Sequence, residues 1–256
     1  MNYQFDFSEK VVLITGGNRG LGRAIAEGFS SLGATTILVG RNVEKLSETE
    51  EAILASGGKC IKIQADLNES SQVDNMINII KTQFGRVDIL INNAGVGHRI
   101  PSVDVTEDQW DTVVDTNLKT PFLLSTRIAK EFMIPQNGGK IISTASMGGF
   151  SGIPASAAYS SSKGGIIQLT RSLATEWAKF NIQVNCICPG YIATELISQA
   201  MSNEQWMKLV AMRTPAGRLG QPDEVVGSAL FLASEMANYI TGTYIQIDGG
   251  CYAAGF

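Results

Sequence analysis

Seven short, nearly continuous apolar runs alternate along this chain with segments of helical pattern. Runs with so few polar positions are typical of strands buried on both faces of a parallel sheet. Their alternation with helices predicts an α/β fold in which helices cover both faces of that sheet. We expect strands at 11–15, 35–40, 59–65, 87–93, 140–146, 183–189 and 244–248.

The segments between these runs predict the helices. Thr106 and Gln109 have the spacing of a capping box, which would open a long helix, and Pro222 suits the first turn of a later one. Residues 191–216 are less regular and could form a helical lid. Without a linker or a repeat, residues 1–256 are predicted to form a single domain. We expect helices at 20–32, 43–54, 71–84, 106–133, 156–177 and 222–233.

The composition narrows the classes of partner. The net charge is −4 and no basic block occurs, which argues against binding to nucleic acid or to an anionic membrane. The first ten residues lack the apolar core of a secretory signal, and no apolar run approaches the roughly 18 residues of a membrane span. We therefore expect a cytoplasmic protein that acts on a small molecule.

Cysteine and histidine are scarce. Cys60, Cys186, Cys188 and Cys251 form no Cys-x-x-Cys pair and are expected to be reduced core residues, with a disulfide or a thiol nucleophile left open. The single histidine, His98, excludes zinc sites built on several imidazoles and would have to serve any Ser-His-Asp triad. We expect no metal site, and His98 either lines a pocket or has no special role.

A glycine-rich turn follows the first expected strand. Residues 15–22 read TGGNRGLG and lead directly into a helix. Glycines at such a turn allow a phosphate to approach the backbone closely, and the helix N-terminus then offers free N–H groups and a partial positive charge. This context predicts a dinucleotide site and a Rossmann-type, doubly wound parallel sheet.

The end of the second expected strand indicates which dinucleotide binds. NAD-binding proteins usually carry an acidic residue there, which contacts the ribose 2′-hydroxyl. This chain has Arg41 instead, and Arg19 in the glycine loop can reach the same region. Guanidinium groups suit a 2′-phosphate, so we favour NADP(H) over NAD(H).

A tyrosine and a lysine four residues apart supply a candidate acid/base. Tyr159 and Lys163 would share one face of a helix, and a nearby ammonium is expected to lower the pKa of the phenol. Ser146, thirteen residues earlier, could hydrogen-bond a substrate carbonyl. The pair alone is a weak signal, but it gains weight from the glycine loop upstream.

The ordered set of motifs resembles the short-chain dehydrogenase/reductase family over nearly the whole chain. The set comprises TGGNRGLG, NNAG at 92–95, Asn117, Ser146, Tyr159, Lys163 and PG at 189–190. The resemblance implies that Tyr159 is the acid/base, that Lys163 binds the nicotinamide ribose, that Ser146 polarises the carbonyl and that Asn117 anchors a water relay. It implies cofactor contacts from Gly16, Asn18, Arg19, Gly20, Leu21, Gly22, Arg41, Asp66, Leu67, Asn92, Asn93, Ala94, Gly95, Tyr159, Lys163, Pro189, Gly190, Ile192 and Thr194.

Within that family the chain is most similar to sugar-acid and ketose reductases of the gluconate 5-dehydrogenase type. The similar stretches are INNAGVGHR, GKIISTASM, NIQVNCICPGYIATEL and RTPAGRLGQPDE. This similarity implies that Arg99 contacts a substrate carboxylate, although a charge at the rim of the pocket is an equally good interpretation. Met147 and Tyr191 are expected to line the substrate site with Ser146 and Tyr159.

Other functions share part of this pattern. A 3-oxoacyl-[acyl-carrier-protein] reductase would use the same catalytic residues, but its carrier usually docks on a basic surface, and 191–216 has only Lys208 and Arg213 against Glu195 and Glu204. A steroid or polyketide ketone reductase is a third option. A non-catalytic nucleotide-binding module would be expected to lack one of the catalytic residues. The resemblance also implies a homotetramer or homodimer that pairs through the long helices at 106–133 and 156–180.

Overall fold

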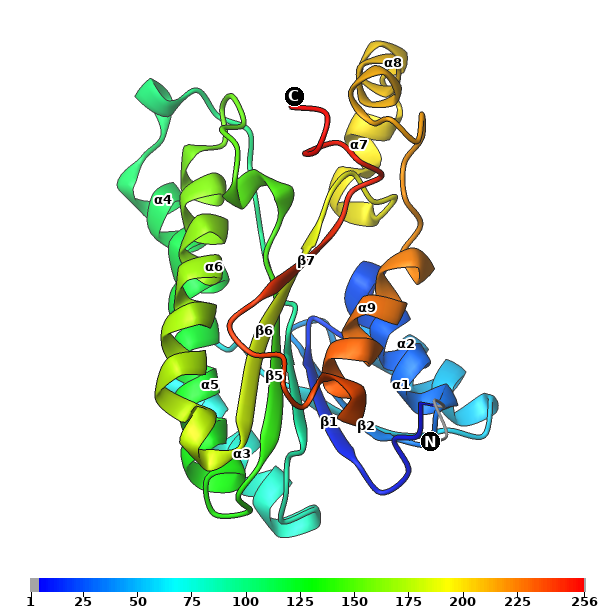
Figure 1. Ribbon diagram of the computed structural model, residues 1–256, viewed down its shortest axis with the longest axis vertical. Coiled ribbons are helices and arrows are strands. Elements are labelled where there is room, and N and C mark those ends of the chain that lie inside the picture. The colour runs from blue at the N-terminus through cyan, green and yellow to red at the C-terminus, as the bar shows by residue number, and fades with distance from the viewer. Residues whose placement is uncertain (1–4, 256) are drawn as a thin grey trace.

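The computed structural model describes residues 5–255 and contains one parallel sheet (Figure 1). Its strand order is β3-β2-β1-β4-β5-β6-β7. Every expected apolar run forms a strand whose ends lie within two residues of the prediction, and the fold-class prediction is confirmed. The strands are β1 (Val11–Thr15), β2 (Thr35–Gly40), β3 (Lys59–Gln64), β4 (Ile89–Asn92), β5 (Gly139–Thr144), β6 (Ile182–Pro189) and β7 (Tyr244–Ile247).

The helices also follow the predicted segments, with one difference. The helix expected over 106–133 begins with the predicted capping box of Thr106 and Gln109. The π-helical segment η2 (Asp115–Lys119) interrupts it, and a second one, η3 (Ala129–Met133), ends it. The lid segment contains two short helices. The helices are α1 (Gly20–Ser31), α2 (Val43–Ala55), α3 (Ser70–Gln83), α4 (Glu107–Val114), α5 (Thr120–Ile128), α6 (Ala157–Trp177), α7 (Ser198–Met201), α8 (Glu204–Arg213) and α9 (Asp223–Ala233).

The core has two layers because consecutive strand residues point to opposite faces of the sheet. Leu13 of β1 belongs to the layer covered by α3, α5 and α6, and its neighbours Val12 and Ile14 belong to the layer covered by α1, α2 and α9. All three side chains are fully buried. Burial on both faces explains why these strands read as continuous apolar runs rather than as an alternating pattern.

The strand order places the site. The chain moves from β1 outward to β2 and β3, then returns to β4 on the other side of β1. At this reversal the loops after β1 and β4 diverge, which leaves a crevice outside the carboxyl ends of the strands. The glycine loop follows β1 and the NNAG segment follows β4, so both expected cofactor segments meet at the reversal.

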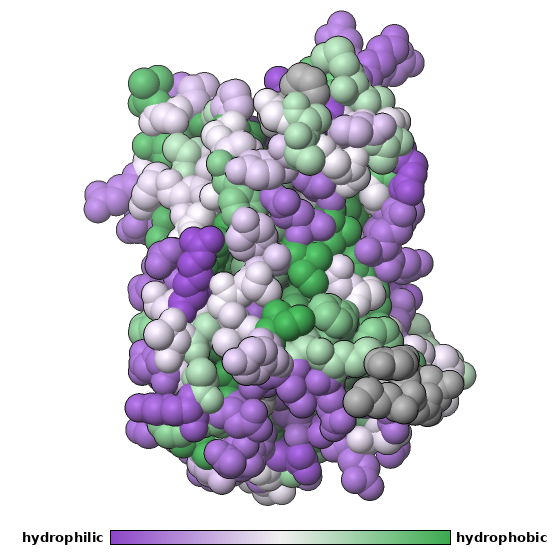
Figure 2. Space-filling view, in the orientation of Figure 1, coloured by the Kyte–Doolittle hydropathy of each residue, from purple (hydrophilic) through white to green (hydrophobic). Residues whose placement is uncertain are grey.

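The hydropathy of the surface varies over the face shown in Figure 2. Hydrophilic residues cover most of the lower end of this face, whereas apolar residues gather near its middle, over β7 and α9. Two exposed large apolar side chains, Met236 and Tyr239, lie between these two elements in the chain. Within residues 5–255, no helix is both long enough and apolar enough to cross a membrane.

Two helical glycines allow a matched test of this packing. A Cβ at Gly22 of α1 would lie 2.2 Å from the Gly16 carbonyl oxygen, whereas a Cβ at Gly227 of α9 would meet nothing within 4 Å. We expect Gly22→Ala to destabilise the fold by about 1–3 kcal/mol through overpacking. Gly227→Ala should stabilise it by about 0.4–1 kcal/mol, because alanine restricts the unfolded chain.

Chemical denaturation of the two variants and the wild type measures both effects. Equal changes in the free energy of unfolding for Gly22→Ala and Gly227→Ala would contradict the close packing of α1 against the glycine loop.

Candidate active site

A cavity of about 440 Å³ lies at the carboxyl ends of the strands, where the strand order reverses. Its walls come from the loops after β1, β2, β3, β4, β5 and β6 and from the start of α6. The residues expected to bind cofactor that line it are Gly16, Asn18, Arg19, Gly20, Leu21, Arg41, Asp66, Leu67, Asn93, Ala94, Gly95, Tyr159, Lys163, Pro189, Gly190, Ile192 and Thr194.

The glycine loop suits a phosphate. Gly16 and Gly20 have φ angles of 64° and 51°, in the left-handed region that glycine adopts without strain. Arg19 precedes α1 without making a side-chain cap, and the first turn of α1 carries no acidic residue. The N–H groups at this helix end are therefore available to an anion.

Gly22 corrects the sequence interpretation. It was expected among the cofactor contacts, but it does not line the cavity. Its missing side chain instead lets α1 approach the Gly16 carbonyl and the Asn93 amide. The third glycine of the loop thus serves the packing of the helix.

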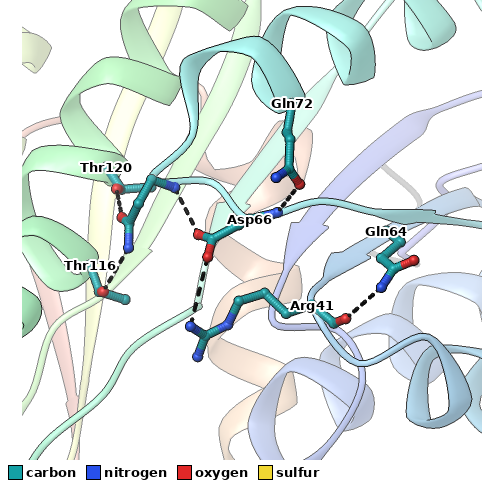
Figure 3. Close-up of polar contacts among 7 residues, drawn as sticks. Arg41, Gln64, Asp66, Gln72, Thr116 and Thr120 are labelled. Carbon is teal, nitrogen blue, oxygen red and sulfur yellow. Dashed lines mark hydrogen bonds and ion pairs between the residues drawn. The ribbon is translucent and has the colours of Figure 1, made fainter.

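Basic side chains line the end of the cavity where the motifs predict the adenosine part of the cofactor, which we call the adenosine end. Arg41 lies 3.8 Å from the Asp66 carboxylate, and the backbone carbonyl of Arg41 accepts a hydrogen bond from Gln64 (Figure 3). Arg19 and Lys45 line the same cavity. The sequence interpretation missed Lys45, although its place four residues after Arg41, in the first turn of α2, could have indicated it.

The loop after β3 adds a second missed residue. The backbone N–H of Asn68 bonds to the Asp66 carboxylate at 3.0 Å, and the Gln72 side chain accepts from the Asp66 N–H at 2.8 Å (Figure 3). Asn68, Thr116 and Thr120 all line the cavity. Only the polar character of the DLNES segment that follows β3 could have suggested Asn68.

At the other end of the cavity Ser146, Tyr159 and Lys163 come together. Ser146 follows β5, and its hydroxyl accepts a hydrogen bond from the Gly148 N–H at 3.1 Å. Tyr159 and Lys163 lie on the first two turns of α6, with the Lys163 Nζ 5.8 Å from the centre of the tyrosine ring. That amine donates to the Thr144 carbonyl at 2.6 Å.

Burial controls the protonation of this pair. Burial raises the pKa of Tyr159, and a hydrogen bond with Ser146 acts more weakly in the opposite direction. Burial also lowers the pKa of Lys163 to about 8. The expectation that the ammonium lowers the pKa of Tyr159 is therefore not met in this structure, because desolvation disfavours the charged form of both groups.

Asn117 holds the wall next to this pair. Its side chain forms two 2.8 Å hydrogen bonds with the backbone of Val96 and one of 3.1 Å to the Ser162 hydroxyl. The residue is buried in η2 and does not line the cavity. A Cβ at Gly95 would lie 3.3 Å from the Asn117 Oδ1 and 3.5 Å from the Lys163 Nζ. Glycine at this position thus keeps the space between these two groups open.

Three other expected contacts lie outside the cavity. The buried Asn92 donates to the hydroxyls of Ser125 and, more weakly, Ser143 instead of lining it. Arg99 is exposed, and Met147 is buried; neither contributes to the wall.

His98 also lies outside the cavity. Its Nε2 lies 3.2 Å from the Gln109 carbonyl in α4, and its Nδ1 is buried without a partner among the described residues. Of the residues expected to contact only substrate, Tyr191 alone lines the cavity.

Two cysteines, Cys186 and Cys188 of β6, lie close enough to the Lys163 amine to influence its pKa. All four cysteines are buried and free. Across residues 5–255, no three or more His, Cys, Asp or Glu side chains gather in a way that could hold a metal ion.

Known proteins resemble this chain over almost its full length. The family model described as "Enoyl-(Acyl carrier protein) reductase" matches residues 16–252. A 2-dehydro-3-deoxy-D-gluconate 5-dehydrogenase of Dickeya dadantii is 39% identical over 97% of this chain and 98% of its own length. An NAD-dependent glycerol dehydrogenase of Listeria innocua is 37% identical over 96% and 95%.

A solved structure agrees with these relatives. The gluconate 5-dehydrogenase of Burkholderia cenocepacia, in complex with NADP and tartrate, superposes with a TM-score of 0.93 at 33% identity, covering 97% of each chain. The chain belongs to the short-chain dehydrogenase/reductase family. The resemblance inferred from its motifs is confirmed, and the protein is an oxidoreductase.

The buried Lys163 makes stability depend on pH. Its pKa is about 8 in the folded protein, against an ordinary value of 10.5, so between these values the unfolded chain binds more protons than the folded one. We expect the free energy of unfolding to rise by roughly 1–2 kcal/mol from about pH 8 to about pH 9.5.

Lys163→Met removes the buried amine and should flatten this rise, as measured by chemical denaturation across the pH range. The matched control is Lys179→Met, which removes an exposed lysine beyond α6 and should keep the wild-type slope. If the free energy of unfolding of Lys163→Met still rises with pH as in the wild type, Lys163 is not the group responsible for the rise.

Proposed function

We propose that this protein is an NADP(H)-dependent oxidoreductase that interconverts a secondary alcohol and a ketone on a sugar acid or a polyol. One observation carries the proposal: Ser146, Tyr159 and Lys163 meet at one end of a cavity whose other end is lined by Arg41 and Lys45. The names of the Dickeya and Burkholderia proteins support a sugar-acid substrate.

The cavity fits a phosphorylated dinucleotide. The uncapped start of α1 suits the pyrophosphate, and Arg19, Arg41 and Lys45 suit a 2′-phosphate. When bound, the dinucleotide supplies or accepts the hydride. NADP in the Burkholderia structure supports this choice, and the Listeria relative keeps NAD(H) as the alternative.

Tyr159 and Ser146 would handle the substrate oxygen. In reduction, the Tyr159 hydroxyl gives its proton to the carbonyl oxygen, and the Ser146 hydroxyl donates a hydrogen bond that holds this oxygen in place. Because burial raises the pKa of Tyr159, the phenol is fully protonated at neutral pH and is ready to act as an acid. Oxidation needs the phenolate, so this direction is favoured by alkaline pH.

Lys163 and Asn117 would organise the same end of the cavity. The Lys163 amine, anchored on the Thr144 carbonyl, would hold the nicotinamide ribose and return a proton to Tyr159 after each turnover. Asn117 keeps the Val96 backbone in place beside these groups. Reaction rate depends strongly on such positioning.

The segment at 191–216 would form the lid over the substrate. Tyr191 lines the cavity, and its ring packs edge-on against Trp206 of α8, with the ring centres 5.8 Å apart. Arg99 is exposed and does not line the cavity, whereas Tyr191 of this segment does, so we infer that substrate selectivity depends more on this lid than on Arg99.

The test is oxidation of NADPH by the purified protein with a panel of ketones. The panel contains 5-keto-gluconate, fructose, sorbose and an acetoacetyl thioester, each repeated with NADH, while 2-dehydro-3-deoxy-D-gluconate is tested for oxidation with NADP⁺. Turnover of a sugar-derived substrate with preference for the phosphorylated cofactor supports the proposal. No turnover of any sugar-derived compound would reject it.

Tyr159→Phe tests the proton step. We expect turnover to fall by roughly 10²–10⁴-fold, the usual contribution of a general acid, because the phenylalanine keeps the ring but has no proton to give. Binding of NADPH, followed by fluorescence titration, should change little. Full activity in this variant would exclude Tyr159 as the acid.

Arg41→Asp tests cofactor selectivity. An acid at this position favours a free 2′-hydroxyl over a 2′-phosphate, so the ratio of kcat/KM for NADPH to that for NADH should fall by at least roughly tenfold. Arg41→Gln removes only the positive charge. It should lower kcat/KM for NADPH without raising kcat/KM for NADH. An unchanged ratio in both variants would mean that Arg41 does not read the phosphate.

A 3-oxoacyl-[acyl-carrier-protein] reductase is the second candidate, because the matching family model is described by an acyl-carrier-protein reductase. The lid carries Lys208 and Arg213 against Glu195 and Glu204, which gives a carrier protein no basic docking surface there. Turnover of the thioester alone in the panel would favour this candidate.

We further propose that the protein forms a homotetramer or homodimer through its long helices. Large apolar side chains on these helices are partly exposed in the single chain, namely Trp110 on α4 and Phe122 and Leu123 on α5. Light scattering that gives the mass of a stable monomer would reject this proposal.

A further inference from the structure

A polar bridge joins the adenosine end of the cavity to the long helix that carries Asn117. The Asn68 side chain donates to the Thr116 hydroxyl at 3.3 Å, and the Thr120 hydroxyl donates to the Asn68 Oδ1 at 2.6 Å. Figure 3 shows Thr116 and Thr120 facing the loop that follows β3. Asn68 thus forms side-chain bonds with two residues about 50 positions further along the chain.

Both partners of Asn68 belong to an unusual part of that helix. Thr116 lies within the π-helical segment η2, and Thr120 is the first residue of α5, immediately after it. A π-helical turn is rare and occurs mostly as a local insertion at functional sites. The bridge therefore ties down both sides of the turn that contains Asn117.

Asn117 connects η2 to the end of the cavity that contains Tyr159. Its side chain holds the N–H and the carbonyl of Val96, and it donates to the Ser162 hydroxyl. That hydroxyl in turn donates to the backbone carbonyl of Tyr159 at 2.7 Å. A shift of η2 would thus move both the wall beside Tyr159 and a contact to its backbone.

The bonds of Asn68 do not serve its own loop. The following helix, α3, is preceded by Glu69, which makes no side-chain cap, and both side-chain bonds of Asn68 lead away to η2 and α5. Locally, only the backbone N–H of Asn68 takes part, by bonding to Asp66. Since Asp66 pairs with Arg41, the bridge links the residues expected at the 2′-phosphate to those expected at the carbonyl.

We propose that Asn68 is a positioning residue: it fixes the π-helical turn and, through Asn117, the wall of the catalytic end. The kinetic part of this inference rests on the proposed function, whereas its structural part does not. Thr116 and Thr120 are its partners in this role.

Asn68→Leu is the first variant, because leucine is similar in size and makes neither bond. We expect kcat for the ketone to fall by roughly 3–10-fold, the effect of losing one side-chain hydrogen bond or somewhat more. The affinity for adenosine 2′,5′-bisphosphate, measured by calorimetric titration, should change by less than about twofold. A residue that only contacts the cofactor would instead lower the affinity for adenosine 2′,5′-bisphosphate and leave kcat unchanged.

Thr120 supplies a matched pair of variants. Thr120→Val keeps the shape but loses the hydroxyl and should reproduce the loss in kcat, whereas Thr120→Ser keeps the hydroxyl and should retain most of the activity. In the double variant Asn68→Leu with Thr120→Val, the losses should not add, because both remove the same bond. Additive losses would overturn the bridge.

Thr126→Val is the control for a lost hydroxyl elsewhere on α5. The Thr126 hydroxyl bonds to the Leu123 carbonyl of its own helix, so this variant should leave kcat unchanged.

Hydrogen exchange gives a readout that does not need turnover. The Val96 N–H is held by Asn117, and its exchange should speed up in Asn68→Leu and Thr120→Val but not in Thr126→Val. If the wild type reduces no ketone, the proposed function fails, while this measurement still decides the role of Asn68.

Unchanged exchange at Val96 together with unchanged kcat would overturn the proposal. If Asn68→Leu does not fold, the Thr120→Val and Thr120→Ser pair gives the same decision from the other side of the bridge.

Discussion

The parallel direction of all seven strands is the constraint on which the site depends. Because every strand runs the same way, the loops after β1, β2, β3, β4, β5 and β6 leave the sheet at one edge. The reversal of strand order between β1 and β4 opens this edge into a cavity. Segments as far apart in the sequence as the glycine loop and the start of α6 then line one site.

Much of the fold could be predicted because strands that are buried on both faces of a sheet have nearly continuous apolar sequences. Strands such as β1 and β6 are buried along their whole length, so they read as apolar runs, and Gly16 marks the turn between strand and helix. The π-helical segments could not be predicted in this way. A π-helical turn is a local insertion, so it leaves no periodic signal in the helix itself.

The candidate site divides in the same manner. Residues on rigid elements or directly after strands, such as Tyr159 and Arg41, line the cavity as their motifs indicated. Asn92, Arg99 and Met147 do not line the cavity, since neighbouring residues of a strand or loop can face opposite ways and spacing alone does not say which faces inward. Asn92 thus bonds to two serines of neighbouring elements rather than facing the cavity.

At the other end of the cavity, burial shifts the pKa values of Tyr159 and Lys163 in opposite directions. Removing water disfavours the Tyr159 phenolate and the Lys163 ammonium alike, which raises the pKa of Tyr159 and lowers that of Lys163. Each group keeps one polar partner, Ser146 for the phenol and the Thr144 carbonyl for the amine. At neutral pH the Tyr159 phenol therefore holds its proton.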